Sequence, residues 1–76
     1  MAKLTTDELL FLDTLYDCGH NHVSDAQLMA RLLSMGFSEE KYGKVKIKLL
    51  FARYVGSVYG NVTLEKKNYR ELTAEP

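Results

Sequence analysis

SDAQLMARLLSMGF, residues 24–37, contains the start, apolar face and stop signals of one complete helix. Ser24 and Gln27 have the spacing of a capping box, in which two side chains satisfy the free amides of the first turn. Gly36 follows the last apolar turn, where a left-handed residue often ends a helix. The stretch therefore predicts a helix over 25–35.

The segment before this stretch predicts a first helix over 5–17. Thr5 and Glu8 form a second capping box, and Gly19 is placed to end the helix. Apolar residues surround most of this helix, and a helix of that kind belongs at the centre of a core. A short chain offers little to cover it, so we expect an exposed remainder and a homodimer through helix one.

The segment after the stretch is ambiguous between helix and strand. Ser38 predicts a third helix start, with acidic residues behind it that favour the positive end of a helix. Residues 44–49 alternate lysine with aliphatic residues, which is typical of a strand, whereas the apolar residues from Ile47 onward follow helical spacing. The cap favours helix, and we predict one over 39–54.

The last part of the chain predicts a β-hairpin over 55–66. Gly60 and Asn61 lie between two runs of β-forming residues and suit a two-residue turn. The expected fold is mainly α (α+β), with three helices followed by a C-terminal β-hairpin in a single small domain, 1–76. The alternative is an all-α four-helix domain, with a fourth short helix starting at Thr63.

Charge divides this neutral chain into two unequal halves. Residues 1–40 hold two cations and seven carboxylates, for a net charge of −5, and residues 41–76 hold eight cations and three carboxylates, for a net charge of +5. A neutral protein with one basic end can bind a polyanion through that end. The distribution therefore indicates binding rather than catalysis.

Composition argues against several other functions. The single cysteine, Cys18, excludes a disulfide within the chain and favours a reducing, cytoplasmic setting. No apolar run is long enough to cross a membrane. Residues 17–22 gather possible metal ligands, but zinc usually takes its ligands from two separated pairs. We expect no metal, no cofactor, no small-molecule substrate and no enzymatic activity, because neither a nucleophile with its base nor a phosphate loop is visible.

Three helices followed by a basic β-hairpin resemble the winged helix-turn-helix family over about residues 5–70, in element order, lengths and charge. In that family the third helix enters the major groove, and the hairpin touches the DNA backbone or minor groove. The resemblance implies a transcription regulator that contacts duplex phosphates. Lys46 and Arg53, seven residues apart, share one face of the predicted helix. The candidate residues for nucleic-acid or partner binding are Lys41, Lys44, Lys46, Lys48, Arg53, Tyr59, Lys66 and Lys67.

The alternative function is a small inhibitor or adaptor that binds a larger protein stoichiometrically, as expected of a phage-type host-takeover or anti-defence factor. Its two charged halves then match complementary patches on that protein. Tyr59 and Tyr69, near the basic hairpin, are candidates for either interface, since tyrosine is favoured at binding sites.

Overall fold

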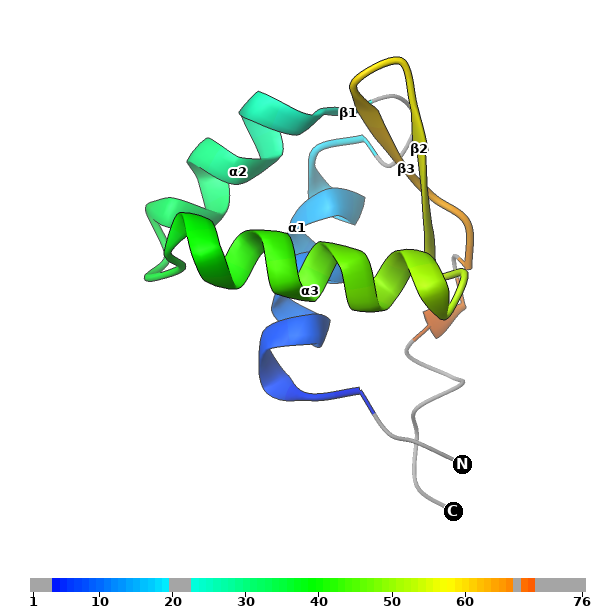
Figure 1. Ribbon diagram of the computed structural model, residues 1–76, viewed down its shortest axis with the longest axis horizontal. Helices are drawn as coiled ribbons and strands as arrows, with labels where there is room; N and C mark the ends of the chain where they lie inside the picture. The colour runs from blue at the N-terminus through cyan, green and yellow to red at the C-terminus, as the bar shows by residue number, and fades with distance from the viewer. Residues whose placement is uncertain (1–3, 20–22, 67, 70–76) are drawn as a thin grey trace.

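The computed structural model describes residues 4–19, 23–66 and 68–69. In chain order, the elements are α1 (Thr6–Asp17), β1 (Val23–Ser24), α2 (Asp25–Leu33), α3 (Glu39–Phe51), β2 (Val55–Val58) and β3 (Asn61–Leu64). The strands form one antiparallel sheet in the order β1-β3-β2 (Figure 1). The predicted α+β fold with three helices and a C-terminal hairpin is confirmed. The four-helix alternative is wrong, because its fourth helix was placed where β3 lies.

α1 lies at the centre of the molecule. The predicted capping box is present, with the Thr5 amide donating to Glu8 Oε1 at 2.9 Å and the Glu8 amide donating to Thr5 Oγ1 at 3.1 Å. The helix contacts α2, α3 and β3, and α3 crosses in front of it in Figure 1. These elements cover Phe11, Leu12 and Leu15 completely, as expected of a helix at the centre of a core, and the exposed remainder of the helix includes Tyr16, which is 49% exposed. A homodimer through α1 stays a prediction.

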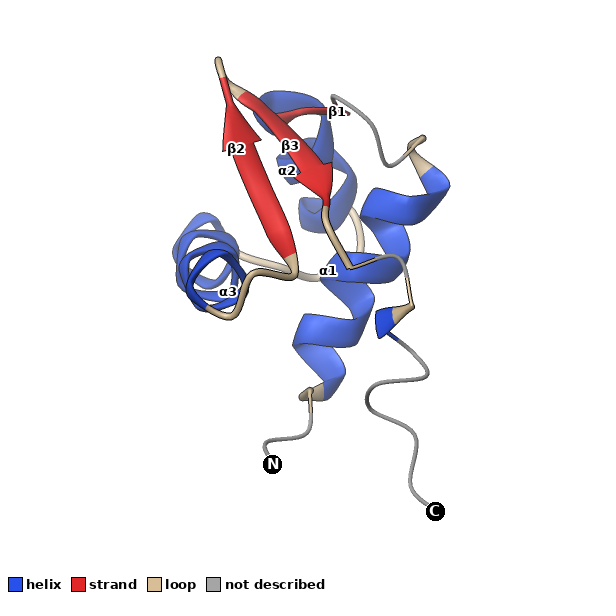
Figure 2. Cartoon of the chain, turned by 90° about the vertical axis from the view of Figure 1, so that its right-hand side faces the viewer, coloured by secondary structure: helices blue, strands red, loops and turns tan. Residues whose placement is uncertain are grey.

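The hairpin turn lies one residue earlier than predicted. The turn residues are Tyr59 and Gly60, whose φ angles of 51° and 79° are both positive, as a type I′ turn requires. The predicted turn at Gly60-Asn61 is wrong because Asn61 is already the first residue of β3. The observed register directs Val62 and Leu64 into the core. Figure 2 shows β3 between β2 and β1.

The sheet contains a third strand that the sequence did not indicate. β1 has only two residues, and Val23 pairs with Val62 of β3. Two residues are too few for an alternating pattern to be recognised. The Asp25 amide also donates to the Gly60 carbonyl at 2.9 Å, which joins the start of α2 to the hairpin turn.

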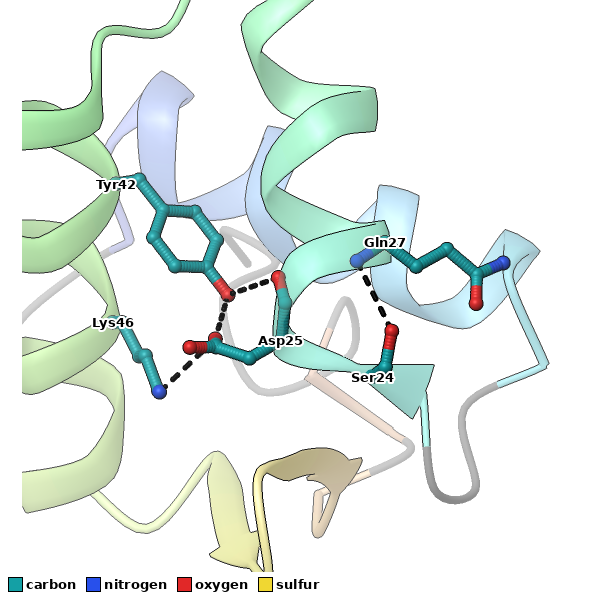
Figure 3. Close-up of polar contacts among 5 residues, drawn as sticks. All are labelled: Ser24, Asp25, Gln27, Tyr42 and Lys46. Carbon is teal, nitrogen blue, oxygen red and sulfur yellow. Dashed lines mark hydrogen bonds and ion pairs between the residues drawn. The ribbon is translucent and has the colours of Figure 1, made fainter.

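α2 begins and ends by the predicted signals, with smaller differences. Ser24 Oγ accepts from the Gln27 amide at 3.1 Å, but the Gln27 side chain points away from Ser24 (Figure 3), so the predicted capping box is a simple N-cap. Gly36, with a φ of 103°, lies just after the helix, and the Phe37 amide donates to the Leu32 carbonyl at 3.0 Å. The helix itself ends at Leu33, two residues before the predicted end, because its last turn tightens towards that glycine.

α3 is helical through residues 44–49. Its buried residues, Tyr42, Val45 and Leu49, lie three and four positions apart on one face. The helix ends at Phe51, three residues before the predicted end at 54. Arg53 takes the left-handed conformation with a φ of 64°, which stops the helix there. This stop was missed because glycine, not arginine, is the usual residue at such a position.

Candidate functional site

The four lysines of α3 lie beside carboxylates. The Nζ–oxygen distances are 3.5 Å for Lys41–Asp7, 3.4 Å for Lys44–Glu40, 3.0 Å for Lys46–Asp25 and 3.4 Å for Lys48–Glu8. These carboxylates belong to α1, to the start of α2 and to α3 itself. The acidic and basic halves of the sequence therefore pack against each other, and these lysines point to different elements rather than to one shared surface.

The Lys48–Glu8 pair joins α3 to the first turn of α1. The Glu8 side chain is only 9% exposed, while that of Lys48 is 71% exposed. Glu8 Oε1 already accepts the Thr5 amide, so Lys48 meets the second carboxylate oxygen. A carboxylate this buried needs its charge satisfied, and Lys48 supplies the nearby cation. This role is structural.

Asp25 is the acceptor of a polar cluster between α2 and α3 (Figure 3). The Tyr42 hydroxyl and the Lys46 ammonium group both donate to Asp25 Oδ1, the latter at 3.0 Å. Burial raises the pKa of the Tyr42 hydroxyl well above its usual range, and the neighbouring carboxylate raises it further. Partial burial acts to raise the pKa of Asp25, but the hydrogen bonds from Tyr42 and Lys46 and the charge of Lys46 lower it overall. Lys46 is thus part of a cluster that holds two helices together.

The other predicted contact residues lie at and beyond the end of α3. Arg53 follows the helix and is exposed, so it does not share a helical face with Lys46 as its spacing predicted. Lys66 Nζ donates to the Ala52 carbonyl at 3.2 Å and lies 4.6 Å from the centre of the Tyr54 ring. Lys67 lies outside the described residues, as do the two histidines considered as metal ligands.

The two tyrosines predicted for an interface have opposite positions. Tyr59, in the hairpin turn, is 99% exposed. Tyr69 is buried, and its hydroxyl donates to Asp13 of α1. The prediction that Tyr69 contributes to an interface is wrong, because Tyr69 folds back along the chain and packs against α1.

The outer face of α3, which we define as Glu40, Gly43, Lys44, Ile47 and Phe51, is directed away from the buried face. Ile47 is 55% exposed and Phe51 is 84% exposed. Together with Leu50 they line a shallow apolar hollow. A neighbouring hollow extends from this end of the helix to the hairpin, with Arg53 and Glu65 at its polar side.

Sequence reasoning missed this apolar surface because it used the spacing of Ile47 and Phe51 only as evidence for a helix. Both follow helical spacing, so they counted towards one apolar face. The available signal was that α3 holds more apolar residues than one face accommodates. Ile47 and Phe51 are four apart and lie on the side opposite Val45 and Leu49.

The described part of the chain contains no group of three or more His, Cys, Asp or Glu side chains able to hold a metal ion. Among the same residues, no helix has the length and apolar character needed to cross a membrane. Comparison of the chain with protein-family models, with curated proteins and with solved structures finds no match.

Proposed function

We propose that this chain is a small, non-enzymatic protein-binding module that contacts a larger protein through the outer face of α3 and the hairpin tip. The observation that carries the proposal is the exposure of two aromatic side chains, Phe51 at the end of α3 and Tyr59 at the hairpin tip. Phe51 lies with Ile47 and Leu50 at an apolar hollow, and Tyr59 lies at the far end of β2. Large exposed hydrophobic side chains mark protein contacts, and aromatic residues dominate binding energy there.

Backbone conformation supports the same proposal. Arg53 and Tyr59 both have positive φ angles, at positions where glycine is the usual residue. A residue with a β-carbon is disfavoured in this conformation by roughly 1–2 kcal/mol. Tyr59 is almost fully exposed, so its ring adds little to the stability of its own fold. A contact between the Tyr59 ring and another molecule would explain why tyrosine occupies this position.

DNA binding by a winged helix-turn-helix-like domain is the alternative, supported by the order of three helices and a hairpin. DNA binding would require α3 to enter a groove with the apolar side chains of Ile47 and Phe51 facing the bases. Base edges, however, are recognised mainly by hydrogen bonds. Each lysine of α3 that bound a phosphate would also have to break its ion pair with a carboxylate of the same chain. The geometry favours a protein partner.

Photo-crosslinking in the native cells tests the proposal and identifies the partner in the same experiment. The photoreactive residue p-benzoylphenylalanine replaces Phe51 or Tyr59, and Ala30, exposed on α2, serves as the matched control position. We expect positions 51 and 59 to give an adduct with the same larger protein, identified by mass spectrometry, and position 30 to give none. Equal labelling from all three positions contradicts the proposed surface.

A turn variant separates binding from folding. Tyr59→Asn creates Asn-Gly, the preferred pair for a type I′ turn, so thermal stability is expected to stay equal or rise. Affinity for the crosslinked partner is expected to fall by about tenfold. Binding to nonspecific duplex is measured beside it by fluorescence anisotropy at two salt concentrations. Strong salt-dependent duplex binding that Tyr59→Asn leaves unchanged, with no protein adduct, would overturn the proposal in favour of DNA.

A further inference from the structure

Gly43 is the residue of α3 that the fold of a single copy does not explain. Its φ is not positive, and a β-carbon built there meets no atom within 4 Å. Neither a special conformation nor a crowded neighbour requires glycine. Glycine inside a helix also destabilises it by about 1 kcal/mol relative to alanine. What a helical glycine does provide is room for another molecule to approach the backbone closely.

The open space at Gly43 lies on the same face as the two most exposed apolar residues of α3. Gly43, Ile47 and Phe51 follow one another at intervals of four and so form one stripe along the helix. Phe51 projects a ring, Gly43 leaves a gap, and Ile47 lies midway between them, about 6 Å from each along the axis. A two-fold axis through Ile47 brings the ring of each of two copies to the gap of the other.

Charge along α3 is arranged to suit the same antiparallel pairing. The first turn of the helix carries Glu39 and Glu40, while Lys48 lies in the last turn and Arg53 follows it. The pair between Lys44 and Glu40 on the outer face is exposed and leaves Glu40 accessible to a second cation. An antiparallel partner places the acidic end of each helix beside the basic end of the other, and the helix dipoles then also oppose. The whole chain has no net charge, so two copies do not repel each other.

We propose that a second copy of this chain binds the outer face of α3, forming an antiparallel homodimer with Phe51 of each copy over Gly43 of the other and Arg53 beside Glu40. This inference rests on the proposed function, since a second copy then competes with the larger protein for the outer face of α3, while the hairpin tip stays open to the larger protein in either state. A single helix of 13 residues offers a small interface, so the dimer is expected to dissociate at tens of micromolar, an order-of-magnitude figure.

Disulfide crosslinking tests the position of the two-fold axis. Ile47→Cys and the control Ala30→Cys are each made in a Cys18→Ser background and oxidised in a glutathione buffer. A disulfide requires the two Cα atoms to come within about 7 Å, which a residue on the axis satisfies. We expect covalent dimer from Ile47→Cys at least about tenfold faster than from Ala30→Cys. Equal rates from both positions contradict the antiparallel pairing.

Sedimentation velocity over a range of concentrations tests the contacts. Gly43→Ala is expected to raise the melting temperature, because alanine favours the helix, and yet to weaken the dimer by about tenfold, because it fills the gap. Phe51→Ala is expected to weaken the dimer similarly without lowering the melting temperature. Glu40→Arg should weaken it, and adding Arg53→Glu should restore it.

A wild-type chain that stays monomeric at about 1 mM would overturn the dimer, since even weak specific interfaces associate there. Dimerisation that Gly43→Ala and Phe51→Ala leave unchanged also rejects this interface. The proposed function is judged separately: an adduct from position 59 with a larger protein supports it even when the chain is a monomer. A dimer whose position 59 labels no other protein fails the proposed function alone.

Discussion

The two sides of α3 differ in how their residues are satisfied. The inner side buries Tyr42, Val45 and Leu49, and lysines at its edges meet carboxylates of α1 and α2. The outer side leaves Ile47 and Phe51 exposed. The comparison shows that positive charge in this helix mainly neutralises acidic groups of its own fold, while apolar surface faces outward. The binding surface of this helix is therefore predicted better by the side chains that remain exposed after packing than by the net charge of the segment.

The largest expected difference between the two sides is in folding stability. Leu49→Ala removes a buried side chain on the inner side and is expected to lower the free energy of unfolding by about 2–5 kcal/mol. Phe51→Ala, two residues away on the outer side, is expected to change it by less than about 0.5 kcal/mol. Urea denaturation followed by circular dichroism, at low protein concentration, measures both. Similar losses for the two variants would mean that Phe51 packs within its own chain.

Much of the fold could be predicted because its signals are local. Thr5 with Glu8, Ser24 at a helix start and Gly36 after a helix act within one turn of the chain, and the structure shows each in its expected role. A cap is chemistry between residues three or four apart, so sequence order alone displays it. Helix starts were accordingly predicted within one residue, whereas α2 and α3 end two and three residues before their predicted ends.

The rest depends on contacts between distant parts of the chain. Arg53 ends α3 in a conformation that nothing in its own chemistry favours. β1 exists only because β3 lies beside it. The ion pairs of α3 join residues as far apart as Lys48 and Glu8, so a charge count by halves suggests separated surfaces that packing then brings together. The candidate lysines were thus identified as charged but not as already paired.

A smaller effect is expected from the polar cluster on the inner side. Tyr42→Phe removes the hydroxyl that donates to Asp25 and is expected to lower the free energy of unfolding by about 1–3 kcal/mol near neutral pH. The lowered pKa of Asp25 means that its contribution is present above the ordinary value of 3.8 and is lost as pH falls below it. The raised pKa of Tyr42 means that its contribution is present below pH 10.0 and is lost as pH rises beyond it.

The stability difference between wild type and Tyr42→Phe should therefore be largest between about pH 5 and pH 9 and should shrink at both extremes. Chemical denaturation at a series of pH values measures it. Tyr59→Phe is the matched control, because it removes the same hydroxyl from a fully exposed ring, and its effect should be close to zero. A difference for Tyr42→Phe that stays constant from acid to alkali would show that the hydroxyl does not bond the ionised carboxylate.

The smallest expected effect compares one ion pair from each side of the helix. Lys48 meets the nearly buried Glu8, whereas Lys44 and Glu40 are both more than three-quarters exposed. Double-mutant cycles with Lys48→Met and Glu8→Gln, and with Lys44→Met and Glu40→Gln, measure the two coupling energies. We expect about 0.5–1 kcal/mol for the inner pair and no more than about 0.3 kcal/mol for the outer pair, because water screens the exposed charges more strongly. Added salt at about 1 M should remove the outer coupling first. Equal coupling energies would show that Lys48 contributes no more to folding stability than Lys44 does. The lysines of α3 would then be as free to bind a polyanion as the sequence predicted.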